Sequence, residues 1–182
     1  MWKQWKAIAL LMLVSSSIAA QQTAAPIGLE LGEATCNEAS RRLKVGAGDG
    51  ISVWSGGPIL RIPANAPSIE LDGLVGGLIV CDAQDRVIFV SLTLSKGGMA
   101  REGVTSTARQ LDSKYRATQR NLPPVGDGYA EWKAANGTVE IDSPHLSFEF
   151  DVRYWAPGAK VLYQEWQATE RRQREQKKAG NL

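Results

Sequence analysis

Residues 74–94 read LVGGLIVCDAQDRVIFVSLTL, and this stretch decides the fold. Two runs rich in Val, Ile, Leu and Phe stand on either side of the polar residues 82–85. Runs of this composition around a four-residue turn are typical of a β-hairpin. The first run, residues 74–81, is apolar apart from two glycines, which predicts a central buried strand, and residues 86–94 supply its partner.

Upstream of the hairpin, the sequence predicts one helix and two short strands. Thr35 and Glu38 have the spacing of a capping box, which predicts a helix over residues 36–44. Alternating apolar residues then predict strands over residues 51–54 and 60–62. Nearby prolines favour edge strands or irregular connections there.

Downstream of the hairpin, helical spacing of apolar residues predicts a second helix over residues 105–118. A proline-containing loop at residues 121–127 precedes three further predicted strands, over residues 129–133, 139–142 and 146–155. The last of these strands places alternate apolar side chains on one face: Leu146, Phe148, Phe150, Val152 and Tyr154. A third helix is predicted over residues 159–178.

The order helix, strands, helix, strands, helix predicts an α+β fold, with helices packed on one face of an antiparallel sheet. It amounts to a rough duplication of a helix-plus-sheet unit. A chain of 182 residues suits one domain, which we place at residues 28–168 after a flexible lead-in at residues 21–27. Residues 169–182 form a charged helical tail, read as a solvated helix end or, alternatively, as a basic patch for an acidic or phosphate-bearing partner.

Residues 1–20 have the layout of a secretory signal peptide. Lys3 and Lys6 precede an apolar run at residues 7–14, and small residues follow it. A membrane-spanning helix needs about 20 apolar residues, so this run is too short to be an anchor. We therefore expect export to the periplasm and no stable membrane insertion.

The charge balance argues against a nucleic-acid partner. Removal of Lys3 and Lys6 with the leader leaves 19 basic and 19 acidic residues. Proteins that bind nucleic acid usually carry a clear basic excess. We therefore expect no nucleic-acid partner.

Cys36 and Cys81 are the two cysteines of the chain. In an exported domain, two cysteines predict one structural disulfide. The alternatives are a reactive thiol or a metal ligand, but a metal site would need more Cys or His than the single His145. We expect no metal and no cofactor.

The sequence offers no convincing catalytic set. His145 follows Pro144 at a strand start, and no nucleophile elbow accompanies it, so we interpret it as a turn histidine that hydrogen-bonds backbone. The acidic pairs Glu140/Asp142 and Glu149/Asp151 have strand spacing and are interpreted as solvating groups rather than glycosidase carboxylates. We predict that the protein is not an enzyme and name no catalytic residue.

Tryptophans close to loops and strand ends are the candidate partner-binding residues. Aromatic side chains in such places are enriched at protein interfaces. The alternative is that they cover one face of the sheet as core residues. The candidates are Trp54, Trp132 and Trp155.

Residues 28–38, GLELGEATCNE, resemble the opening of small Gram-negative envelope modules that begin with a Leu-Gly-x-x-Thr helix start. Residues 111–115 and 143–148 are similar to segments of periplasmic proteins of this type. The resemblance implies the helix-plus-sheet unit shared by β-lactamase-inhibitor protein and the small lipoprotein of the outer-membrane barrel-assembly machinery. The chain departs from the lipoprotein members because it has no lipobox. The resemblance implies a binding module and carries over no catalytic residue.

These observations favour a periplasmic protein that acts by protein–protein binding, as an inhibitor or immunity protein against a toxic or lytic enzyme. An envelope-assembly or scaffolding factor is the alternative hypothesis. A small hydrolase is the third.

Overall fold

The computed structural model of the chain describes residues 22–64, 66–97 and 101–180. Within these residues the chain forms three α-helices, one short 3-10 turn and a single eight-stranded antiparallel sheet. No helix among them combines the length and the apolar composition that crossing a membrane requires. The predicted signal peptide at residues 1–20 lies outside the described residues.

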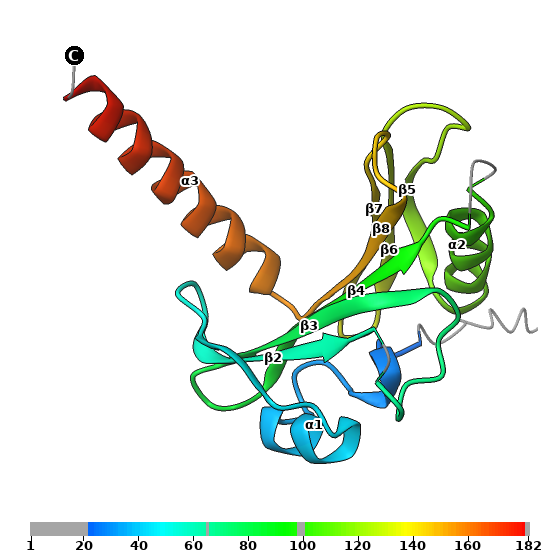
Figure 1. Cartoon of the computed structure of the whole chain (residues 1–182), viewed down its shortest axis with the longest axis horizontal. Coiled ribbons are helices and arrows are strands. Elements are labelled where there is room, and N and C mark those ends of the chain that lie inside the picture. Colours follow the sequence, from blue (N-terminus) through cyan, green and yellow to red (C-terminus); the bar gives the residue numbers. More distant parts are fainter. Residues whose placement is uncertain (1–21, 65, 98–100, 181–182) are drawn as a thin grey trace, which may run out of the picture.

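The elements form two consecutive units and a final helix (Figure 1). After the 3-10 turn Pro26–Gly28, the first unit contains α1 (Cys36–Leu43), β1 (Ala47–Ile51), β2 (Gly56–Pro63), β3 (Leu74–Asp82) and β4 (Val87–Ser95). The second unit contains α2 (Glu102–Lys114), β5 (Arg116–Asn121), β6 (Gly128–Ala134), β7 (Gly137–Ser143) and β8 (Glu149–Trp155). The final helix is α3 (Ala159–Ala179).

The strand order is β1-β2-β3-β4-β8-β7-β6-β5. Each unit is therefore a helix followed by a four-stranded meander, and the last strands of the two units, β4 and β8, pair at the centre. This arrangement confirms the antiparallel sheet and the α+β class. The predicted order holds only in part, because the second unit has four strands where three were predicted.

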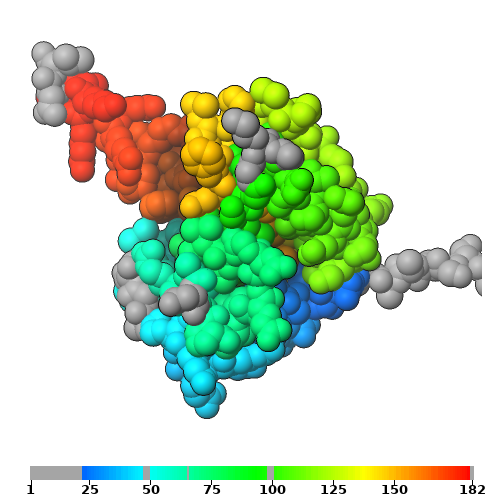
Figure 2. Space-filling view, turned by 45° about the vertical axis from the view of Figure 1, so that its right-hand side comes forward, coloured from blue at the N-terminus to red at the C-terminus, as the bar shows by residue number. Residues whose placement is uncertain are grey.

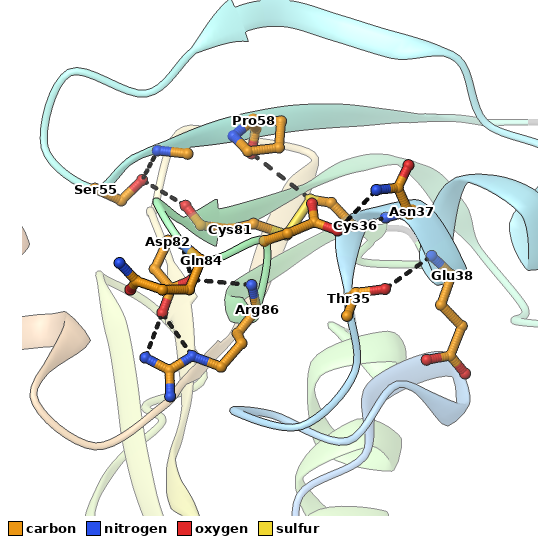
Figure 3. Close-up of a disulfide and its surroundings, with 12 residues drawn as sticks. Thr35, Cys36, Asn37, Glu38, Ser55, Pro58, Cys81, Asp82, Gln84 and Arg86 are labelled. Carbon is orange, nitrogen blue, oxygen red and sulfur yellow. Dashed lines mark hydrogen bonds and ion pairs between the residues drawn. A yellow bond between two sulfur atoms is a disulfide. The ribbon is translucent and has the colours of Figure 1, made fainter.

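The β3–β4 hairpin lies where the sequence predicted it. Its turn is held by Asp82, whose carboxylate accepts hydrogen bonds from the backbone N–H of Gln84 at 3.0 Å and of Arg86 at 2.9 Å, and from the Arg86 side chain (Figure 3). Burial would raise the pKa of Asp82, but these hydrogen bonds outweigh burial and lower it. β3 is not the central strand that the glycine-containing apolar run suggested, because β4 and β8 occupy the centre.

The predicted disulfide joins Cys36, the first residue of α1, to Cys81 in β3 (Figure 3). The two Cα atoms are 6.1 Å apart, an ordinary spacing for a disulfide. The hydroxyl of Thr35 accepts a hydrogen bond from the backbone N–H of Glu38 at 3.1 Å, which confirms the predicted helix start. The covalent bond therefore fixes the beginning of α1 to the sheet.

α1 and α2 pack on the same face of the sheet, where the core lies. α2 buries Val104, Ala108 and Leu111 against that face. The strands of both units contribute alternate apolar side chains to it: Ile62, Ile79, Leu92, Leu94, Val139, Ile141, Phe150 and Val152.

α3 does not share this face. Adjacent strand residues point to opposite faces, and Trp132 bonds to Asp112 of α2 while its neighbour Glu131 pairs with Lys160 of α3. α3 therefore starts on the opposite face, and it projects away from the body (Figures 1 and 2). The expectation of helices on one face holds for α1 and α2 and is wrong for α3.

Two predicted boundaries in exposed regions are wrong. Residues 53–55 form a turn closed by hydrogen bonds between Ser52 and the backbone of residues 56 and 57, so the first strand is Ala47–Ile51 rather than residues 51–54. The second helix ends at Lys114 instead of 118, because the backbone becomes extended at Tyr115 and continues as β5. Every side chain of β5 is exposed, so its sequence carries no apolar alternation.

The predicted strand over residues 146–155 begins only at Glu149. Residues 144–148 form a turn in which the backbone N–H of Ser147 bonds to the carbonyl of Pro144. Leu146 and Phe148 therefore do not join the apolar face of Phe150 and face solvent instead.

Residues 22–27, in the segment predicted as a lead-in, form hydrogen bonds with the second unit. The side chain of Asn136, in the β6–β7 turn, accepts from the backbone N–H of Ala24 at 2.6 Å and donates to its carbonyl at 3.2 Å. The N–H of Ala135 bonds to the carbonyl of Gln22. An asparagine amide offers both a donor and an acceptor, so one side chain ties this segment down.

Candidate functional site

Three large apolar side chains stand almost fully in solvent on two neighbouring loops. Leu146 is 94% exposed, Phe148 85% and Val125 72%. Val125 lies in the β5–β6 loop, and the other two lie in the β7–β8 loop at the same end of the sheet (Figure 1). We refer to these three side chains as the loop patch. Grouped exposed apolar residues of this kind mark interaction surfaces more often than scattered ones do.

Hydrogen bonds through His145 connect the two loops. Its Nδ1 accepts from the backbone N–H of Gly126 at 3.1 Å, and its own backbone N–H donates to the carboxylate of Asp127 at 2.7 Å. The predicted role of His145 as a turn histidine that bonds backbone is confirmed. By connecting the two loops, His145 also keeps the loop of Val125 beside the loop of Leu146.

Arg101 forms hydrogen bonds with both loops. Its guanidinium donates to the carbonyls of Pro123 and Gly126, each at 2.9 Å, and to the carbonyl and hydroxyl of Ser143. Arg101 caps the start of α2 in a left-handed conformation, with φ of 53°. A non-glycine residue rarely adopts this conformation, so the surrounding contacts must hold it there.

Lys96 supplies a second cation at the same place. It is only 4% exposed, its Nζ donates to the carbonyl of Pro144, and its backbone N–H donates to the carbonyl of Phe148 at 2.8 Å. Desolvation and the nearby Arg101 lower the pKa of Lys96. Among the described residues no carboxylate forms an ion pair with either cation. We refer to Lys96 and Arg101 as the cation clamp.

The cation clamp bonds mainly to backbone carbonyls, and the carboxylate of Asp127 acts to raise the pKa of Lys96 without forming an ion pair with it. Burying an amino group without a carboxylate partner is unfavourable unless hydrogen bonds compensate. In the described part of the chain, the Nε of Arg101 is a buried donor that has no partner. Burial of Lys96 and Arg101 therefore costs free energy at the position where they hold the two loops.

Two of the three predicted tryptophans are core residues. Trp132 is 0% exposed, and its indole donates to the carboxylate of Asp112 at 2.8 Å. Trp155 is also buried and donates to the carboxylate of Glu140 at 2.9 Å. Neither indole offers a surface to a partner in this structure.

Trp54 is half-buried in an aromatic cluster at the base of α3. Its ring centroid lies 5.5 Å from that of Tyr163 and 6.4 Å from that of Trp155. Phe89 packs on Trp155 at 4.2 Å, and Trp166 extends the cluster along the helix. The cluster seats α3 on the sheet, so Trp54 and Trp155 are brought together while Trp132 lies on the other face.

A charged network beside the aromatic cluster fastens the first turn of α3. Lys160 forms ion pairs with Glu131, at 2.8 Å, and with the buried Glu140, and the hydroxyl of Tyr129 bonds to both carboxylates. Desolvation alone would lower the pKa of Lys160, but the bonds to Glu131 and Glu140 raise it. The interpretation of Glu140 as a solvating group is wrong, because this carboxylate is buried.

The second acidic pair also differs from its interpretation. The guanidinium of Arg153 forms ion pairs with Asp151 on its own strand and with Asp142 on β7, each at 2.8 Å. Asp151 further accepts from the hydroxyl of Thr93 at 2.8 Å. These carboxylates serve cross-strand pairing, whereas Glu149 is exposed.

A wide groove of about 1570 Å³ lies over β4 and β8, between α2 and the loop at residues 68–73. Its floor includes Leu92, Leu94, Phe150 and Val152, which are all buried by their neighbours. Burial raises the pKa of Tyr154 in this groove. A ligand in the groove would find little apolar surface left to cover, so the groove is a weaker candidate than the loop patch.

The sulfur atoms of Cys36 and Cys81 lie close to the carboxylate of Asp85. Because the sulfurs are bonded to each other, they are not thiolate ligands. The carboxylate accepts a hydrogen bond from the side chain of Asn37 at 2.9 Å, which ties α1 to the hairpin turn. This group therefore serves the fold.

Sequence reasoning missed both the loop patch and the cation clamp. Leu146 and Phe148 continued the alternation of the following strand, although Pro144 nearby was a signal for an irregular start. Lys96 and Arg101 are isolated cations in a glycine-containing connection, and no local pattern marks them as buried. Their partners lie 22 to 48 residues away.

Comparison with known proteins adds no relative. No protein-family model, curated protein or solved structure matches the chain. Its function is therefore inferred from its own geometry.

Proposed function

We propose that this chain is an exported periplasmic protein that acts by binding another protein, as an inhibitor or immunity protein against a toxic or lytic enzyme. The observation that carries the proposal is the loop patch, in which Val125, Leu146 and Phe148 are exposed on two loops that the cation clamp holds together. Exposed apolar patches mark protein–protein interaction sites, and Phe is among the residue types enriched at interfaces.

The rigidity of the loops supports this function. Binding through flexible loops costs conformational entropy, and loops that are already ordered avoid much of that cost. Arg101 alone supplies four hydrogen bonds to the two loops, and His145 adds two more. The loop patch is therefore presented in one conformation before any partner arrives.

Two further features suit an exported binding protein without catalysis of its own. A structural disulfide such as Cys36–Cys81 is typical of oxidising compartments. The charged groups Glu131, Glu140 and Lys160 are engaged with one another, and His145 is engaged with the loops. This favours structural roles for the groups that catalysis would otherwise use.

An envelope-assembly or scaffolding factor is the second candidate, and α3 favours it. This helix projects from the body (Figure 2). Its residues Val161 and Leu162 are exposed. Residues 169–182 carry five basic and two acidic side chains. A projecting helix gives a scaffold a second contact site, distinct from the loop patch.

The two candidates are separated by what the protein does to its partner. The purified protein is used to capture partners from a periplasmic extract, and each captured enzyme is then titrated with it. An inhibitor abolishes the activity of that enzyme at about one equivalent, as expected for tight one-to-one binding. A scaffold leaves activity intact and recovers several envelope proteins together.

The matched control is Val53→Ser, a 78% exposed apolar residue in the turn between β1 and β2, at the opposite end of the sheet from the loop patch. Val53→Ser should behave like the unaltered protein, whereas Leu146→Ser with Phe148→Ser should lose the partner. Equal capture by all variants would contradict the role of the loop patch.

A further inference from the structure

The rim of the loop patch is acidic. The two loops, residues 122–128 and 143–149, contain two charged side chains, Asp127 and Glu149. Both are exposed, and they border the patch: Asp127 bonds to the backbone of His145, and Glu149 follows Phe148 directly. Lys96 and Arg101 are directed inward at carbonyl groups. Lys96 interacts electrostatically with Asp127 but forms no ion pair with it, and Glu149 has no cation partner among the ion pairs of the described residues.

We propose that the loop patch inserts into an apolar socket on a partner protein and that basic side chains border this socket. The inference rests on the proposed function and adds the chemistry of the partner's surface. Apolar contacts supply the binding energy at the centre, and complementary charges at the rim steer the encounter. Phe148 is the principal anchor, because aromatic side chains dominate the energy of such interfaces.

The charges of Asp127 and Glu149 argue against two other binding partners for the loop patch, a lipid surface and a second copy of the chain. An anionic lipid surface would be repelled by Asp127 and Glu149, and membrane-binding loops usually carry lysine or arginine, which these two loops lack. A second copy docked patch to patch would place four carboxylates against one another. A separate protein with a basic rim is the occupant that satisfies both the apolar centre and the acidic border.

The test places a photo-crosslinking amino acid, p-benzoylphenylalanine, at Phe148 and, as the control, at Gln173 on the exposed side of α3. Irradiation of cells that export the full chain should link a protein at residue 148 and not at residue 173. The linked protein is then purified, and its affinity for the unmodified chain and for variants is measured at several salt concentrations.

Phe148→Ser should weaken binding by about 30-fold, the effect of losing one hot-spot anchor. Asp127→Asn with Glu149→Gln should weaken binding about threefold to tenfold and flatten its dependence on salt, because screened rim charges act mainly on association. Phe148 and Glu149 are exposed, and Asp127→Asn keeps an oxygen that can accept from the backbone N–H of His145, so melting temperatures should change little.

Five outcomes would overturn the inference. If Phe148→Ser leaves the affinity for the linked protein unchanged, Phe148 is not the anchor. Binding that is independent of salt and unchanged by Asp127→Asn with Glu149→Gln would contradict the proposed basic side chains around the socket. Binding to phosphatidylglycerol vesicles that Phe148→Ser abolishes would make the occupant a membrane. Crosslinking of a protein only from residue 173 would also overturn the inference while leaving the proposed protein-binding function standing, whereas no linked protein from either position would remove both.

Discussion

The two units of the sheet share one architecture and are stabilised by different means. In the first unit a disulfide joins the helix to a strand, and the hairpin turn is closed by one well-bonded carboxylate, Asp82. In the second unit the helix is joined to the sheet by polar contacts, with Asp112 of α2 bonded to Trp132 and to Arg120. The cation clamp, in the connection between β4 and α2, holds the loops of the second unit, and the charged network joins the second unit to α3.

The difference shows where conformational precision is needed. A disulfide stabilises a unit mainly by restricting its unfolded state, and it does not direct surface loops. Buried hydrogen bonds to carbonyls hold particular backbone positions, although each buried cation reduces the net gain. The unit with the costlier contacts is the one that displays Leu146 and Phe148.

The largest effect is expected for Trp132→Ala in the second unit. The indole is fully buried and bonded to Asp112, so its removal should lower the free energy of unfolding by about 5 kcal/mol. Denaturant titration would measure the change, and Trp166→Ala, at the half-exposed end of the aromatic cluster, is the control. A loss below that of Trp166→Ala would contradict the placement of Trp132 in the core.

Removal of the disulfide tests the first unit. The double variant Cys36→Ala with Cys81→Ala should lose about 3–4 kcal/mol, because the bond closes a long loop of the unfolded chain. Amide exchange should rise in α1 and β3 and change little in α2 and β6. Equal loosening of both units would break the comparison between them.

Lys160→Met should have a moderate effect, about 2 kcal/mol. The change leaves Glu140 buried without its cation, and the partial exposure of Lys160 limits the loss. Adding Glu140→Gln to this variant should recover part of the stability, since the unpaired charge is then gone. Thermal unfolding measures both, and a double variant less stable than Lys160→Met would contradict the network.

A smaller effect is expected from acid. Burial would raise the pKa of Glu131, but hydrogen bonds from Lys160 and Thr118 outweigh burial and lower it. The group is therefore protonated more readily in the unfolded chain, and its contribution is present above pH 4.5 and lost as pH falls through the folded pKa. Melting temperatures followed from pH 6 to pH 3 should fall less steeply for Glu131→Gln, and parallel curves would contradict this.

His145→Gln should have the smallest effect. A neutral hydrogen bond contributes about 1 kcal/mol, so partner binding should stay within about tenfold and the melting temperature should change little. Binding measurements with the crosslinked partner test this. Complete loss of function at an unchanged melting temperature would assign His145 a chemical role.

Local signals made much of the first unit predictable. The hairpin, the helix start at Thr35 and the pairing of Cys36 with Cys81 all follow from neighbouring residues or from composition. The second unit was harder, because its decisive contacts join distant residues. Trp132 illustrates the problem: strand alternation places Glu131 and Lys133 on the opposite face, but it does not say whether the face of Trp132 is covered, which depends on Asp112 of the distant α2.

The candidate site escaped prediction for a related reason. Side-chain alternation before Phe150 predicted that Leu146 and Phe148 would be buried, and only the turn at residues 144–148 separates them from the strand. Burial of Lys96 depends on loops that come later in the sequence. Periodicity describes a strand once it exists and does not fix where it begins.

The pairing of β4 with β8 has a consequence for the order of synthesis. The first unit can complete its meander as soon as β4 emerges, but α2 and three more strands must follow before β8 emerges and covers the outer edge of β4. Until then an apolar strand at the edge of a half-finished sheet is open to pairing with other chains. A nascent chain stalled before β8 would therefore be prone to aggregation. Chaperones that shield unpaired strand edges should reduce this aggregation most during that interval.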